Sequence, residues 1–106
     1  MGLLGPDFCR WYPLAEAAAH APPAPGVLQL RVAHGTLLDY PGGKSAMIHY
    51  AAADDLRAAA TALAAAHAGT GWLCRHTDGE VADPGAMLAA LTDMFTRRFG
   101  TPPRWP

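Results

Sequence analysis

The sequence is poor in cysteine and has no long apolar run. Its 106 residues include only Cys9 and Cys74, too few for a framework of disulfides, so we expect reduced thiols and a cytoplasmic protein. The first residues lack the basic segment and apolar core of a signal peptide. No stretch is apolar enough to span a bilayer, and the sequence therefore predicts neither export nor a membrane partner.

Positive charge is scarce as well. Eight Lys and Arg residues against nine Asp and Glu residues give a net charge of −1. The long-range attraction for polyanions that nucleic-acid-binding proteins usually have is therefore missing, which argues against nucleic acid as a partner.

Metal-binding spacings are also missing. The five histidines form no HxxxH or HExxH pair, so neither a metal nor another cofactor is predicted. Cys74 and His76 supply only two ligands. They could instead form a catalytic pair on one face of a strand, although a cysteine in a strand is more often a small core residue.

The chain does contain enough apolar sequence for one core. Hydrophobic residues make up 51% of it, and its length predicts a single domain over residues 1–106. Residues 1–25 are expected to form a short helix and a proline-rich lead-in, residues 26–100 the core, and residues 101–106 a tail.

Periodicity predicts the elements of this core. Apolar and polar residues alternate, as in strands, over three segments: 26–33, 46–50 and 71–76. Residues 37–40 can pair back briefly. Helical spacing runs from Asp54 to Gly69 and from Asp83 to Gly100, with acids as N-caps and glycines as stops. We expect an α+β fold with a small, mostly antiparallel sheet of three or four strands, packed with two main helices plus a short N-terminal helix.

Strand alternation also predicts a polar sheet face. If Leu28, Leu30 and Val32 face the core, Gln29 and Arg31 point the other way. A face with these polar groups suits a carboxylate or phosphate, which arginine binds through charge-assisted hydrogen bonds.

Two further residues can join this face. His49 joins it if Ile48 and Tyr50 are buried, and Arg75 joins it in one of the two orientations of its strand. The opposite orientation of that strand presents a different set: Trp72, Cys74 and His76. The alternative for the whole face is an ordinary solvated surface.

These residues suggest binding of a small polar or anionic molecule, with a chemical step. Gln29 would orient the ligand, Arg31 would supply charge, and His49 would act as acid or base near neutral pH. Further help would come from Lys44, Arg75 and a tyrosine, either Tyr40 or Tyr50.

The glycine-rich segment Gly43-Lys44-Ser45 has two interpretations. It lacks the leading glycine and the following helix of a phosphate loop. We interpret it as a hairpin turn with a solvated lysine, or as a site where Lys44 is the electrostatic partner of an anionic ligand.

Three short motifs resemble the GIY-YIG nuclease superfamily: Pro25-Gly-Val-Leu28, Tyr40-Pro-Gly-Gly-Lys-Ser45, and Asp55-Leu-Arg57 at the start of a helix. The resemblance covers about Pro25 to Phe99 and implies an α+β domain with the same order of elements. It further implies tyrosines on the first two strands, an arginine on the next helix, and a metal-binding glutamate on a later helix.

The motifs are degenerate. Leu28 stands where the first tyrosine would be, and the second motif is either Tyr40-Pro-Gly-Gly or His49-Tyr50-Ala51. Lys44 and Arg57 carry over, whereas the last helix offers only Asp93 as an acid. The resemblance thus implies a retained scaffold without the nuclease chemistry.

We therefore expect a GIY-YIG-like domain that binds a small polar or anionic molecule and could transform it by acid–base chemistry. One alternative is a metal-dependent phosphodiesterase acting on nucleic acid. Another is a noncatalytic interaction module that docks a partner on its aromatic ends, Trp11, Tyr12 and Trp105. The sequence leaves the oligomeric state open, a homodimer included.

Overall fold

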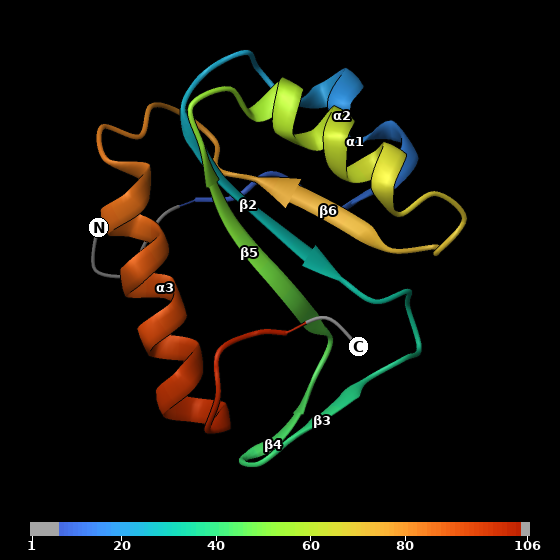
Figure 1. Cartoon of the computed structure of the whole chain (residues 1–106), viewed down its shortest axis with the longest axis vertical. Coiled ribbons are helices and arrows are strands. Elements are labelled where there is room, and N and C mark those ends of the chain that lie inside the picture. Colours follow the sequence, from blue (N-terminus) through green and yellow to red (C-terminus); the bar gives the residue numbers. More distant parts are fainter. Residues whose placement is uncertain (1–6, 105–106) are drawn as a thin grey trace.

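The computed structural model describes residues 7–104. In this part of the chain three helices accompany a four-stranded antiparallel sheet and a separate two-stranded sheet (Figure 1). The predicted α+β fold is confirmed. None of the three helices is both long and apolar enough to cross a membrane.

The main sheet has the strand order β1-β6-β2-β5, and every neighbouring pair is antiparallel. Its strands are β1 (Tyr12–Pro13), β2 (Gly26–Arg31), β5 (Met47–Ala53) and β6 (Leu73–His76). The small sheet is a hairpin of β3 (Leu38–Tyr40) and β4 (Gly43–Ser45). The helices are α1 (Leu14–His20), α2 (Leu56–Ala66) and α3 (Pro84–Phe99).

Capping explains where the two longer helices begin and end. The carboxylate of Asp55 accepts a hydrogen bond from the Ala58 amide, and that of Asp83 accepts one from the Ala86 amide, each at 3.0 Å. Gly100 ends α3 with a φ of 87°, a left-handed conformation that glycine adopts without steric cost. The predicted N-cap and stop of α3 are therefore confirmed, whereas the N-cap of α2 is Asp55 rather than the predicted Asp54, and α2 ends at Ala66, before the predicted stop at Gly69.

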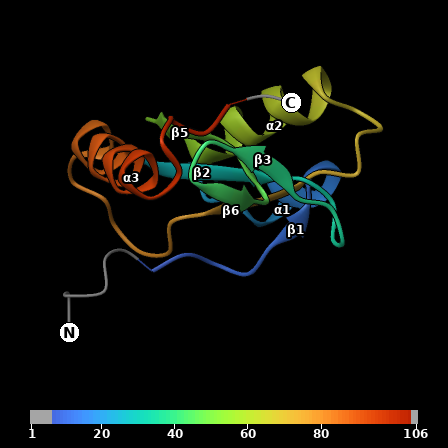
Figure 2. The same ribbon diagram turned by 90° about the horizontal axis from the view of Figure 1, so that it is seen from below.

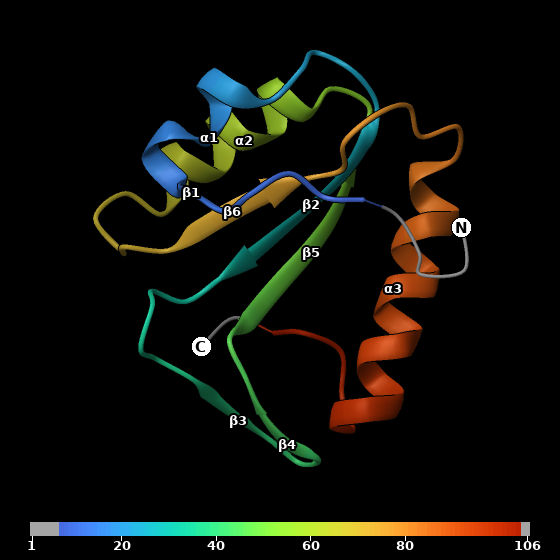
Figure 3. The same cartoon turned by 180° about the vertical axis from the view of Figure 1, so that it is seen from behind.

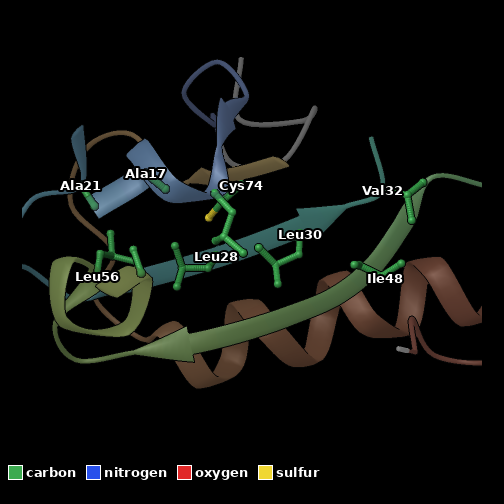
Figure 4. Packing of buried hydrophobic residues seen from close by; sticks show 10 residues of the cluster. Ala17, Ala21, Leu28, Leu30, Val32, Ile48, Leu56 and Cys74 are labelled. Carbon is green, nitrogen blue, oxygen red and sulfur yellow. The ribbon is translucent and has the colours of Figure 1, made fainter. Parts of the chain in front are cut away.

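The hydrophobic core lies between α1, α2 and one face of the sheet (Figure 4). Leu28 and Leu30 of β2 supply its centre, and Cys74 lies opposite Leu30 on β6. The helices contribute mostly small side chains, which allow close packing: Leu14, Ala17, Ala21, Leu56 and Ala60. Burying each leucine contributes about 2 kcal/mol.

Helix α3 lies apart from the other two, alongside β5 (Figure 2). Its one buried side chain, Phe95, makes edge-on ring contacts with Tyr40 at 5.0 Å and Tyr50 at 5.9 Å between centroids. The hairpin and α3 are thereby joined to the face of the sheet opposite the core.

Two pairings differ from the expectation. Strand β1 was not predicted, yet Tyr12 and Pro13 pair with Cys74 and Leu73 at the edge of the main sheet. The segment that includes Leu38–Tyr40 pairs with Gly43–Ser45 instead of turning back onto the preceding strand. Both pairings depend on partners that local alternation does not identify.

Candidate functional site

The candidate site is the sheet face that does not carry the main core. Gln29 of β2 lies directly opposite Tyr50 of β5 on one side and Arg75 of β6 on the other. Directly opposed residues of antiparallel strands point to the same face, and Arg31 follows Gln29 by two residues. The structure therefore brings together four of the predicted residues: Gln29, Arg31, Tyr50 and Arg75.

Arg75 is the centre of this group. Its Nε donates a 2.7 Å hydrogen bond to Oε1 of Gln29, which is only 3% exposed. Its guanidinium carbon lies 4.6 Å from the ring centre of Phe8 and 4.5 Å from that of Trp11. These rings belong to the segment that runs along β6 before α1 (Figure 3), and they hold the cation by cation–π contact.

Arg31 lies close to the same aromatic segment. Its guanidinium carbon is 5.7 Å from the ring centre of Trp11, and its Nε donates to the carbonyl of Val32 at 3.2 Å. The positive charge of Arg31 also lowers the pKa of Arg75, after the larger effect of burial. Two like charges thus share one face of the sheet.

No carboxylate balances these charges within residues 7–104. The ion pairs there join Lys44 to Asp39 and Arg97 to Asp93. The groups that raise the pKa of Arg75 are the Tyr50 phenol and the Cys9 thiol. Burial raises the pKa of Tyr50 to about 12 and also raises that of Cys9, so both groups are neutral at pH 7.

His49 does not join this face. It lies directly opposite Leu30, whose side chain is in the main core. The register shifts at this point, because Leu30 pairs with His49 but Arg31 pairs with Met47, and Ile48 becomes the extra residue of a bulge. The expectation that His49 shares the polar face is therefore wrong. It assumed that Tyr50 faces the core, whereas Tyr50 lies opposite Gln29 and regular alternation then directs His49 to the core side.

His49 lies on the side of the sheet that faces α2. Burial lowers the pKa of His49, and the nearby His67 at the end of α2 lowers it further. Because of the bulge, Ile48 points to the core and Tyr50 to the polar face, although a regular strand would direct both side chains to one face.

Tyr40 makes contacts that stabilise the fold rather than lying on the polar face. It is buried, its hydroxyl donates a 2.6 Å hydrogen bond to the Met47 carbonyl, and its ring contacts Phe95 and Phe99. The Arg104 amide donates to the same hydroxyl at 3.4 Å. These contacts fasten the hairpin and the end of the described chain to α3.

Lys44 and Arg57 lie away from the candidate site. Lys44 is exposed on β4 and forms an ion pair with Asp39 across the hairpin, which agrees with the solvated-lysine interpretation. Arg57 begins α2, and its Nε donates a 2.9 Å hydrogen bond to the Ala21 carbonyl at the end of α1. Arg57 therefore links the two helices.

Sequence reasoning missed a contact between Cys9 and His76. The Cys9 sulfur lies 3.4 Å from Nδ1 of His76, and the two residues also share a backbone hydrogen bond of 2.9 Å. Burial raises the pKa of the Cys9 thiol and lowers that of the His76 imidazole, so both are neutral rather than an activated ion pair. Only the unpredicted pairing of this segment with β6 could have indicated the contact.

A ligand site on the polar face would require a hollow there, but two cavities of the described part of the chain lie elsewhere. One cavity lies between the loops before β2 and after β6, and another lies between the start of α1 and the end of α2. Gln29, Arg31 and Arg75 line neither. Of the expected aromatic ends, Trp11 packs near the arginines, Tyr12 stacks on His20 at 3.8 Å, and Trp105 is outside the described residues.

The residues do not fit the divalent metal that the family resemblance implies. Asp93 is on the exposed side of α3 and pairs with Arg97 at 2.9 Å. Within residues 7–104 no group of three His, Cys, Asp or Glu side chains could hold a metal ion. We therefore derive no step through a metal.

The motifs that carry the resemblance to GIY-YIG nucleases lie on separate parts of the fold. Pro25–Leu28 forms the start of β2 and the residue before it, Tyr40–Ser45 spans the hairpin turn, and Asp55–Arg57 contains the N-cap and first residues of α2. The relationship to that superfamily remains a prediction. Comparisons with models of protein families, with curated proteins and with solved structures find no match to this chain.

Proposed function

We propose that the protein binds a small anionic molecule through Arg31 and Arg75. The observation that carries the proposal is the half-buried guanidinium of Arg75, which has no carboxylate partner among residues 7–104. A partly desolvated cation is costly without a counterion, and an anionic ligand would supply one.

The geometry of Arg75 favours a forked acceptor. Its Nε is committed to Gln29, whereas Nη1 and Nη2 make no hydrogen bond to the described part of the chain. A carboxylate or a phosphate can accept two parallel hydrogen bonds from a guanidinium, which a halide cannot do. Arg31, at the end of β2, would add a second positive charge on the same face.

Binding is better supported than catalysis. His49, the expected acid or base, lies on the opposite face of the sheet. Tyr50 keeps its proton at neutral pH because burial raises its pKa to about 12. Within residues 7–104 the face therefore offers cations and a hydrogen-bond acceptor but no histidine that could act as acid or base.

A titration with inorganic phosphate tests the proposal. At constant ionic strength, we expect phosphate to shift the nuclear magnetic resonance signals of Arg75, Arg31 and Gln29. Arg75→Gln should weaken binding by about tenfold to a hundredfold, the range for charge-assisted hydrogen bonds of about 1.5–3 kcal/mol.

A matched control removes one positive charge elsewhere. Arg97 is exposed on α3 and pairs with Asp93, so Arg97→Gln changes the net charge equally without touching the site. Equal loss of affinity in Arg97→Gln and Arg75→Gln would mean nonspecific attraction and would refute the proposal. A thermal melt of each variant separates loss of binding from loss of folding.

A further inference from the structure

A cavity of about 810 Å³ opens at one end of the molecule, away from the arginines. It lies between the loop that leads into β2 and the loop that follows β6, both at the top of Figure 1. Its walls are mostly apolar, with two prolines among the lining residues: Pro22, Ala24, Pro25, Val81 and Ala82. The volume is within the range of about 300–1,000 Å³ that is typical of small-molecule sites.

The polar side chains in the lining are all acidic. Asp78 and Glu80 contribute two exposed carboxylates, and no lysine or arginine lines the cavity. Neither carboxylate belongs to an ion pair within residues 7–104. An apolar cavity with this charge is complementary to a ligand that combines a cation with an apolar body.

Other charged residues near the cavity already form hydrogen bonds within the protein. Asp55 and Asp83 accept hydrogen bonds from the first turns of α2 and α3. Arg57, the basic residue at the start of α2, donates through Nε to the Ala21 carbonyl. Asp78 does interact with His76, whose pKa it raises against the larger lowering effect of burial.

The residues beneath the cavity, where the two loops join β2 and β6, are tightly packed. Gly26 follows the proline-rich loop, and a Cβ atom at this position would lie 2.4 Å from Oγ1 of Thr77 and 2.7 Å from Cδ1 of Leu56. Thr77 Oγ1 in turn accepts a hydrogen bond from the Val27 amide at 3.1 Å. The two loops that form the walls are thus held together at their roots, so the cavity does not depend on a mobile closure.

We propose that this cavity binds a small organic cation, an ammonium or amidinium group carried on an apolar ring or chain. The apolar body packs against Pro22, Pro25 and Val81, and the cation lies near Asp78 and Glu80. This site is separate from the anion site in position and in charge, and either one can fail without the other.

Three matched probes test the assignment: benzylammonium, benzyl alcohol and benzoate. In a nuclear magnetic resonance titration we expect benzylammonium to shift the amides of residue 24 and residues 78–82, with clearly weaker shifts from benzyl alcohol. Benzoate should leave these amides unchanged and act, if anywhere, near Arg75. Equal shifts from benzylammonium and benzyl alcohol would reject a charge-selective site.

Variants of the exposed acids provide the second arm. The double substitution Asp78→Asn with Glu80→Gln should weaken benzylammonium binding about fivefold to tenfold, because exposed charge pairs each contribute modestly. Glu80→Lys, which changes the charge of the pair by the same two units, should weaken it to a similar degree, and the control Asp93→Asn on α3 should have no effect. Unchanged binding in the double variant would overturn the proposal. Shifts of the same amides that grow with protein concentration alone would also overturn it, because a second copy of the chain would then occupy the cavity.

Discussion

Arg75 donates a 2.7 Å hydrogen bond from Nε to Oε1 of Gln29, its direct neighbour on β2. The guanidinium also lies over the Phe8 and Trp11 rings, and its terminal nitrogens make no hydrogen bond to residues 7–104. A neutral amide orients the cation here without neutralising it.

Gln29→Glu should therefore close the anion site. A carboxylate at this position would form an ion pair with Arg75 and compete with any anionic ligand. We expect at least about tenfold weaker phosphate binding by calorimetry, while the fold is retained in urea unfolding. Gln29→Met, which adds no charge, is the control. Wild-type affinity in Gln29→Glu would contradict the assignment.

Tyr40→Phe should destabilise the hairpin and α3. The substitution removes the hydroxyl that donates to the Met47 carbonyl at 2.6 Å, from a residue only 6% exposed. We expect a loss of about 1–3 kcal/mol in the free energy of unfolding, measured with urea. Tyr12→Phe is a suitable control, because the Tyr12 hydroxyl has no hydrogen bond to a described residue. A loss of the same size in the control would refute this interpretation.

Two glycine substitutions should have opposite effects. Gly26→Ala forces a methyl group against Thr77 and Leu56, and overpacking of this kind costs about 1–3 kcal/mol. Gly85→Ala places its methyl 3.6 Å from Asp83 in ordinary contact and favours the helical conformation of α3. We expect Gly85→Ala to stabilise the protein by up to about 1 kcal/mol. Thermal unfolding of the two variants side by side tests the contrast.

Stability should decrease in alkaline solution. Burial raises the pKa of Tyr50 from 10.0 to about 12, so the folded state binds its proton more tightly than the unfolded state. This contribution is complete below pH 10 and is lost as the pH rises through about 12. Tyr50→Phe should flatten the decrease, which urea unfolding across this pH range would measure. An equal slope in both proteins would contradict the prediction.

Stability should also decrease in acid, for the opposite reason. Burial lowers the pKa of His76 below 6.5, so the unfolded state binds protons more readily. The contribution is present above pH 6.5 and is lost as the pH falls through the folded pKa. His76→Gln should reduce the acid sensitivity more than His34→Gln, which changes an exposed loop residue. Chemical unfolding at a series of pH values measures the difference.

The sequence predicted the helices well because their signals are local. Asp83-Pro84 and Gly100 bracket α3, and each acts through its own backbone geometry within one turn. Strand alternation likewise predicted correctly that Leu28 and Leu30 share the core side and that Gln29 and Arg31 share the other.

What could not be predicted depended on register between distant segments. The pairing of β5 with β2 directs Tyr50 to the polar face and His49 to the core side, and nothing in the local sequence marks this register or the bulge at Ile48. Strand β1 and the Cys9–His76 contact arise only when the N-terminal segment meets β6, more than sixty residues later. The contacts of Phe8 and Trp11 with Arg75 depend on the same pairing and were therefore also missed.

The pairing of the N-terminal segment with β6 has a consequence for handling the protein. Residues 8–13 cover the outer hydrogen-bonding side of β6, and removing them would leave its amides and carbonyls available to other chains. A version trimmed at its start, by a protease or by design, would keep most of the central packing yet become prone to intermolecular strand addition and precipitation.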